Sequence, residues 1–170
     1  MPEPLIDNQL DPSFRVQISQ EKGGEKITRC FACDTCTLGC PVRATDDSFN
    51  PRRIIHLALL GAKREVLESG FVWLCSSCYL CSERCPQDVS VTELMCAIRN
   101  IAVREGQIPT AYVAQLELLD KHGRLYEIGD FENKKRTKMG LPRVEEKREE
   151  VARILELVGA TRHYRKEPAP

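Results

Sequence analysis

Apolar residues recur at helical spacing just after Asn50, and the flanking residues suit the two ends of a helix. Asn50 can cap the first turn, and Pro51 fits the first helical position, where no backbone donor is needed. Gly61 favours a stop because glycine readily adopts the left-handed conformation that ends helices. The pattern therefore predicts a helix from Pro51 to about Leu60. Its apolar positions are Ile54, Ile55, Leu57 and Ala58.

A second helix is predicted between Ser90 and Gly106. Ser90 and Glu93 have the Ser-x-x-Glu spacing of a capping box, in which each side chain bonds the other residue's backbone N–H. Gly106 favours the stop. The apolar positions in between are one helical turn apart, which predicts one buried face. They are Val91, Leu94, Met95, Ile98 and Ala102.

The rest of the chain also favours helices. One is expected from Pro109 to Lys121 with Gly123 as its stop, and another from Arg143 or Val144 to Val158. The best strand candidate is the short segment Phe71–Leu74. Together these patterns predict a mostly α fold.

The cysteines and the turn-forming residues divide the chain into three parts. Residues 1–26 are polar and rich in proline and glycine, which predicts a loosely ordered N-terminal arm. Residues 27–106 contain all nine cysteines. Residues 107–170 are expected to form a helical C-terminal extension with a frayed tail, His163–Pro170.

Composition narrows the possible classes. The chain has 170 residues, 42% of them hydrophobic, and equal numbers of basic and acidic residues, 25 of each. Zero formal charge gives no overall attraction to nucleic acid or to an anionic membrane. The longest apolar stretch, Ile54–Ala62, is far shorter than the roughly 20 residues that span a bilayer, and the first ten residues lack a signal-peptide pattern. We therefore expect a cytoplasmic protein without a membrane span, whose clustered cysteines bind metal.

Two cysteine runs carry the chemistry. Their patterns are Cys30-x-x-Cys33-x-x-Cys36-x-x-x-Cys40-Pro41 and Cys75-x-x-Cys78-x-x-Cys81-x-x-x-Cys85-Pro86. This spacing is typical of [4Fe–4S] ferredoxins, in which the fourth cysteine of each run binds the other cluster. The runs therefore predict two [4Fe–4S] clusters. The ligands of the first are Cys30, Cys33, Cys36 and Cys85, and those of the second are Cys75, Cys78, Cys81 and Cys40. Zinc sites and disulfides fit less well, because structural zinc favours separated Cys-x-x-Cys pairs.

The segment between the runs indicates which ferredoxin fold to expect. Cys40 and Cys75 are separated by 34 residues, which include the helix predicted after Asn50. Small β-rich ferredoxins have short hairpins there. A helix after each run points instead to an α-helical ferredoxin domain, here with extra C-terminal helices.

The chain resembles the C subunit of soluble heterodisulfide reductase and its relatives. The resemblance rests on both cysteine runs and on further motifs along nearly the whole chain. Those motifs are Gly23-Gly24, Asn50-Pro51-Arg52, Trp73-Leu74-Cys75, Ile98-Arg99 and Arg136-x-x-x-Gly140-Leu141-Pro142. The resemblance implies an electron-transfer protein that works between two partners. One is the A subunit, which carries flavin and iron–sulfur clusters, and the other is the disulfide-reducing, catalytic B subunit. Of the family's functional residues, only the eight cluster cysteines carry over.

One residue departs from the pattern of many relatives, which have glycine where this chain has Asp34. A carboxylate beside the first cluster would lower its reduction potential, whereas a solvent-facing turn residue would not. Cys96 is expected to be a small packed residue rather than a ligand. The histidines, His56, His122 and His163, are expected at the surface or an interface, and Phe31, Phe71, Trp73 and Tyr79 as core around the cofactors.

The sequence contains no catalytic constellation and no flavin or nicotinamide fingerprint, as expected of a protein that transfers electrons without an active site. The charged stretch Glu132–Glu150 is expected to be a solvated face, with a docking surface as the alternative. Two other functions remain open at this point. One is the iron–sulfur subunit of another flavin-dependent dehydrogenase, and the other is a stand-alone ferredoxin-like carrier.

Overall fold

A computed structural model describes residues 10–145 and 148–164. The chain divides between Gln107 and Ile108 into two compact units. Every regular element of the described residues is an α-helix or a 3-10 helix, which confirms the mostly α fold. None of these helices is long and apolar enough to cross a bilayer.

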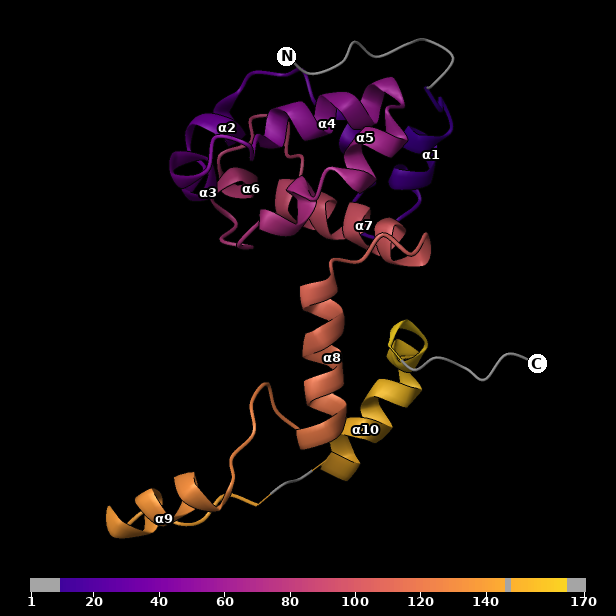
Figure 1. Cartoon of the computed structure of the whole chain (residues 1–170). Coiled ribbons are helices and arrows are strands. Elements are labelled where there is room, and N and C mark those ends of the chain that lie inside the picture. The colour runs from indigo at the N-terminus through magenta and orange to yellow at the C-terminus, as the bar shows by residue number, and fades with distance from the viewer. Residues whose placement is uncertain (1–9, 146–147, 165–170) are drawn as a thin grey trace, which may run out of the picture. The chain divides into compact units, whose positions relative to one another are not determined.

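The first unit gathers its shortest helices at one end (Figure 1). That end contains α2 (Thr35–Leu38), α3 (Pro41–Thr45) and α6 (Leu80–Glu83). The longer helices are α4 (Pro51–Leu60), α5 (Lys63–Glu68) and α7 (Val91–Arg104), and α1 (Phe14–Ser19) lies at the opposite end. Two 3-10 turns, η2 (Ile27–Arg29) and η3 (Phe71–Leu74), lead into the cysteine runs.

Helix α4 forms as predicted. The Asn50 Oδ1 accepts a hydrogen bond from the Arg53 N–H at 2.9 Å, which caps the first turn. Gly61 ends the helix with φ 85°, and a Cβ there would lie 2.4 Å from the Asp11 carbonyl oxygen. Ile54 and Ile55 are buried on its inner face. The predicted caps and the predicted apolar face are both confirmed.

Helix α7 also forms, but the predicted capping box does not. The Ser90 side chain makes no capping hydrogen bond. The Glu93 carboxylate instead accepts from the Tyr79 hydroxyl at 2.8 Å, and the Thr92 N–H donates to the Ser82 Oγ at 3.1 Å. The start of α7 is therefore held by a side chain of α6, which local sequence spacing does not reveal.

The prediction of a loosely ordered N-terminal arm is wrong for Phe14–Ser19, which form helix α1. Phe14 and Ile18 of α1 are fully buried and belong to the same core as α4 and α7. They are four residues apart, so they lie on one face of the helix. Full burial of such a side chain contributes about 1.5–3 kcal/mol, which explains why this short helix is ordered.

Phe71–Leu74 is a 3-10 turn and not the expected strand. Gly70, at φ 68°, starts the turn, and Val72 is buried. The Val72 carbonyl accepts a hydrogen bond from the Arg99 Nε at 2.7 Å. A side chain of α7 thus satisfies this carbonyl, whereas a strand would need a neighbouring strand for the same purpose.

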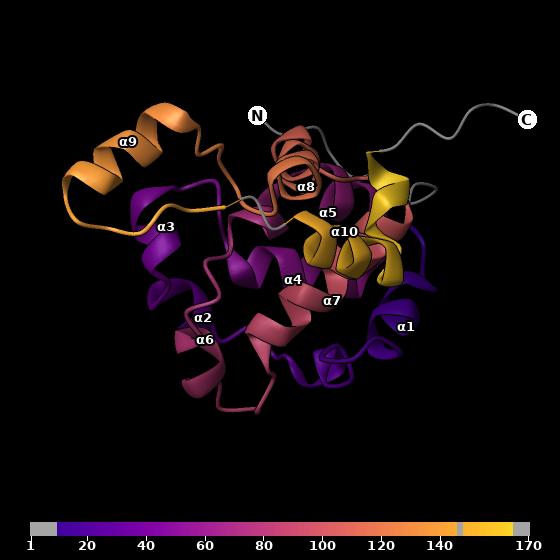
Figure 2. The same ribbon diagram turned by 90° about the horizontal axis from the view of Figure 1, so that it is seen from below.

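The second unit consists of α8 (Thr110–His122), α9 (Asp130–Lys138), α10 (Arg148–Leu157) and the turn η4 (Ala160–His163). Helix α8 begins after Pro109 and ends before Gly123, whose φ is 69°, as predicted. Helix α10 packs along α8 (Figure 2). Its predicted start at Arg143 or Val144 is wrong, since it begins at Arg148.

The reason for this late start lies in Asn133 of α9. Its side chain is buried, donates to the Val144 carbonyl at 3.2 Å and accepts from the Val144 N–H at 2.8 Å. The first of these bonds occupies the Val144 carbonyl, which a helix starting at Val144 would use for its first backbone hydrogen bond. Part of the stretch expected to be a solvated face therefore forms a helix with a buried polar anchor.

Candidate metal centres

The two cysteine runs adopt the same backbone conformation. In each run, the residues before and after the second cysteine have positive φ: Ala32 and Asp34 in the first, Ser77 and Tyr79 in the second, between 54° and 71°. Residues other than glycine rarely adopt this left-handed conformation. Its repetition at equivalent positions shows that both loops turn sharply around the second cysteine. The third cysteine of each run then starts or continues a short helix, α2 or α6.

The eight predicted ligands line two cavities. The first cavity is lined by Cys30, Cys33, Cys36 and Cys85. The second is lined by Cys40, Cys75, Cys78 and Cys81. Each cavity thus receives three cysteines from one run and the fourth from the other. These are the two groups that the spacing predicts, although their role as ligands stays a prediction.

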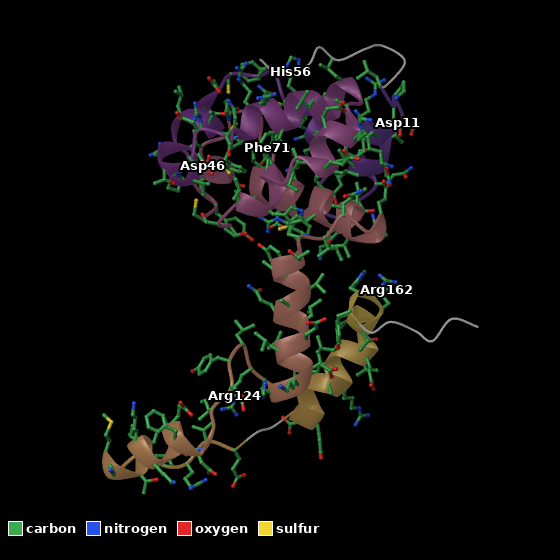
Figure 3. All side chains as sticks on the ribbon, in the orientation of Figure 1. Asp11, Asp46, His56, Phe71, Arg124 and Arg162 are labelled. Carbon is green, nitrogen blue, oxygen red and sulfur yellow. The ribbon has the colours of Figure 1, made fainter. Side chains whose placement is uncertain are left out.

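The cavity walls are otherwise mostly apolar. Ile55 and Val89 line the first cavity, Phe49 and Met95 line the second, and Val91 lines both. In Figure 3, sulfur atoms are seen at the end of the first unit near Asp46. A pocket with four thiols and apolar walls suits a cofactor that binds sulfur and is partly shielded from water.

The electrostatics of the metal-free thiols also fit a cationic group. The pKa of the Cys36 thiol is raised to about 11, mainly by burial; the Thr37 hydroxyl lowers it, and the neighbouring cysteines add a smaller increase. Burial likewise raises the pKa of Cys81. Converging thiolates repel one another, so they are stable together only when iron or another cation compensates their charge.

Hydroxyl groups join each cysteine loop to the helix that follows it. The Thr37 Oγ1 accepts from the Arg52 N–H at 3.1 Å and donates to the Asn50 Oδ1 at 3.0 Å. In the second half, Ser82 accepts from the Thr92 N–H. Thr37 and Ser82 each follow the third cysteine of their run. Sequence reasoning missed both, although superposing the two runs would have placed a hydroxyl at this position twice.

Charged residues surround the two loops differently. Asp34 and Arg52 both line the first cavity, and the Asp34 Oδ1 lies 3.0 Å from the Arg52 Nε. Lys26 and Arg29 pair with the exposed Asp88 near Cys85. No charged side chain is among the residues that line the second cavity. Asp34 is thus an ion-paired residue beside the first site rather than a free turn residue.

Several expected side-chain positions need correction. Phe31 and Tyr79 are 59% and 47% exposed, so they are not core around the cofactors, whereas Phe71 and Trp73 do pack against the core. His56 is exposed as expected. His122 is buried within the second unit, where a surface or interface position was expected, and His163 is partly buried. Cys96 is partly buried on α7 and is not among the residues that line either cavity.

Among the described residues, no three His, Cys, Asp or Glu side chains are arranged to hold a single metal ion. The ligands of a cubane cluster occupy separate corners and need not converge on one point. Residues 26–89 match the family model of the 4Fe-4S dicluster domain, which covers both cysteine runs. The cofactors of this chain are therefore two [4Fe–4S] clusters.

Known relatives identify the family. The C subunit of the H(2):CoB-CoM heterodisulfide,ferredoxin reductase of Methanothermobacter thermautotrophicus is 31% identical over 157 residues, 88% of this chain and 84% of the relative. The chain belongs to the C-subunit family of heterodisulfide reductases. The C2 subunit of the H(2)/formate:CoB-CoM heterodisulfide,ferredoxin reductase of Methanococcus maripaludis is 36% identical over 71% of this chain. The C 2 iron-sulfur subunit of the CoB--CoM heterodisulfide reductase of Methanocaldococcus jannaschii is 34% identical over 69%.

These last two matches leave part of each relative uncovered. The chain spans 65% of the length of the Methanococcus relative and 62% of the Methanocaldococcus one. Membership of the C-subunit family makes this chain an iron–sulfur protein related to subunits of an oxidoreductase. Its partners and its position in an electron-transfer chain are inferred below.

Proposed function

We propose that this chain is the electron-transfer subunit of a heterodisulfide reductase-like complex. In this proposal, Cys30, Cys33, Cys36 and Cys85 hold one cluster, and Cys75, Cys78, Cys81 and Cys40 hold the other. The chain accepts electrons from the A subunit, a flavin and iron–sulfur protein, and passes them to the disulfide-reducing B subunit. It contributes no catalytic residue to the disulfide chemistry.

The observation that carries the proposal is the pair of cavities that share the two runs. A thiol of each run belongs to the cavity of the other, which keeps the two sites in one core, with Val91 on the wall of both. Each bound [4Fe–4S] cluster would supply one-electron transfer, and two clusters held close together would let electrons pass from one to the other. The names of the relatives, which include heterodisulfide and ferredoxin reductases, support the same role.

The chain's own residues have three tasks in this role. The cysteine thiolates bind iron, and the apolar walls formed by residues such as Ile55 and Met95 limit access of water. The Val89 N–H donates to the Cys85 Sγ at 3.3 Å, and the Thr92 hydroxyl lies 3.5 Å from the Cys81 Sγ. Such contacts to sulfur stabilise the more negative state and so influence the reduction potential.

The ligand assignment is tested by replacing one cysteine at a time in protein purified without oxygen. Cys85→Ala should lose the first cluster and roughly half of the iron and acid-labile sulfide, because the first cavity then has three thiols. Cys96→Ala is the matched control, since Cys96 lines neither cavity, and it should keep its full iron content. Equal iron loss in both variants, or none in Cys85→Ala, would contradict the assignment.

The relay itself is tested with the native complex. An anaerobic affinity purification of the chain should bring down a flavoprotein and a second cysteine-rich protein, and the complex should reduce a disulfide such as that of coenzymes M and B. Complex reassembled with Cys85→Ala should bind both partners but lose electron transfer. A chain that elutes alone with two clusters would indicate a free carrier, and a complex with a dehydrogenase lacking disulfide reduction would indicate the other flavin-dependent class.

A further inference from the structure

Two identical clusters in one domain differ in reduction potential only through the protein around them. The two halves of this domain are close copies in their cysteine loops, so the differences between them are informative. One of them is Arg99 of α7, which has no counterpart in the first half. When the starts of α4 and α7 are superposed at Arg52 and Thr92, the position equivalent to Arg99 is Leu59.

Arg99 holds the start of the second cysteine run by two hydrogen bonds. Its Nε donates to the Val72 carbonyl at 2.7 Å, and its Nη2 donates to the Cys75 carbonyl at 2.8 Å. The guanidinium carbon lies 6.0 Å from the centroid of the Trp73 ring. A planar guanidinium suits two such acceptors at once, whereas a lysine ammonium cannot offer the same rigid pair of donors. Arg99 thus fixes η3 and the first ligand of the second run from a partly buried position.

The Arg99 guanidinium forms no ion pair within 4.0 Å with a carboxylate of the described residues. Glu93, on the same helix, accepts from the Tyr79 hydroxyl instead. Beside the first cavity, Asp34 lies against Arg52, so these two charges cancel at close range. Lys26 and Arg29 share the single carboxylate of Asp88 near Cys85.

We infer that Arg99 is a positioning residue for the second cluster and that its positive charge raises the reduction potential at that site alone. Reduction adds one negative charge to a site that already contains four thiolates, and a fixed cation on a ligand's carbonyl favours that state. The inference rests on the proposed ligand sets.

The experiment is an anaerobic potentiometric titration of the purified chain with dithionite as reductant, followed by electron paramagnetic resonance. Each cluster takes up one electron. In Arg99→Gln, one of the two clusters should become harder to reduce, with its reduced-to-oxidised ratio at a fixed potential lowered about tenfold, which equals 59 mV for one electron. The other cluster should keep its potential.

Two further variants separate charge from position. Arg104→Gln removes the same charge from the same helix, but Arg104 pairs with Glu21, so both potentials should stay close to those of the unchanged protein. Arg99→Lys keeps the charge and loses one of the two carbonyl contacts, so the potential should be retained while a chelator removes iron faster. If Arg99→Gln does not load two clusters, Arg99→Lys still decides, because a tenfold shift there would refute the role of the charge.

The inference is overturned if Arg99→Gln shifts neither cluster, shifts both equally, or shifts one no more than Arg104→Gln does. These results differ from a failure of the proposed function. Unchanged protein that does not bind two clusters, or that binds them without passing electrons to partners, contradicts the proposed function. If the protein binds two clusters and neither potential changes when Arg99 is replaced, only the inference about Arg99 is contradicted.

Discussion

Helix α1 offers a sharp test of the packing described above, because Phe14 is fully buried although it lies near the N-terminus. We expect Phe14→Ala to lower the free energy of unfolding by about 3–5 kcal/mol, the usual cost of truncating a buried aromatic side chain. The Lys63 ammonium, 5.9 Å from the centroid of the Phe14 ring, accounts for about 0.5–1 kcal/mol of this loss. Small domains are stable by about 5–15 kcal/mol, so the loss is large.

The assay is anaerobic urea denaturation of cluster-loaded protein, followed by far-ultraviolet circular dichroism, together with the rate of iron release to a chelator. Helix α1 contacts η2, which leads directly into Cys30, so we also expect faster iron release. Val16→Ala is the matched control, because Val16 is on the same helix but 49% exposed, and it should change stability by less than about 0.5 kcal/mol. If both variants unfolded at the same urea concentration, α1 would not belong to the core.

Three other substitutions test single features of the fold. Gly61→Ala should destabilise the first unit by about 1–3 kcal/mol in the same denaturation assay, because φ is 85° there and the new Cβ would meet a backbone carbonyl; unchanged stability would show that this turn can shift freely. The Lys26 ammonium beside Asp88 keeps the pKa of that carboxyl below its usual value, so the stabilisation is present above the unfolded-state pKa and is lost as the pH falls through the lower folded-state pKa. Asp88→Asn should therefore make thermal stability less sensitive to acid, and an acid dependence as steep as before would argue against the pair. Asn133→Ala should remove both bonds to Val144 and speed amide hydrogen exchange at that residue, while exchange in α8 stays the same.

The features that local sequence determines were predictable. Helix α4 needs only its own cap, its apolar face and Gly61, and all three are encoded within a dozen residues. The grouping of the eight cysteines also follows from local spacing, because a run with three cysteines on one loop and a fourth on the next turn presents that fourth thiol elsewhere. Two such runs in one chain then have only one simple way to complete each other's sites.

Features that depend on distant partners could not be predicted. Arg99 donates to carbonyls 24 and 27 positions earlier in the chain, and no periodic pattern of residues in the sequence indicates such a contact. The Asp34–Arg52 ion pair similarly joins a loop to a helix predicted independently of it. The segment Phe71–Leu74 has the composition of a strand, yet without a strand to pair with it becomes a turn whose Val72 carbonyl accepts from a side chain.

The arm and α9 were missed for a different reason, which is that very few buried residues specify each of them. In α1, two side chains make the contact with the core, and proline and glycine around them suggested a flexible segment. A close approach supports the same packing, since a Cβ on Gly24 would lie 2.0 Å from the Ile18 carbonyl oxygen. In α9 the single buried residue is Asn133, whose polar side chain gives no hydrophobic signal at all.

The sharing of cysteines between the two cavities has a consequence for how the protein is made. During synthesis the first run leaves the ribosome as a complete motif, yet both cavities need cysteines from the second run. The second cavity has all four of its cysteines only once Cys81 has been added, and the first only after Cys85. A nascent chain that ends before η3 therefore contains neither set. With the proposed ligand sets, insertion of iron and sulfide waits until the two halves meet, so a truncated chain would offer the cell's assembly machinery no finished site to fill.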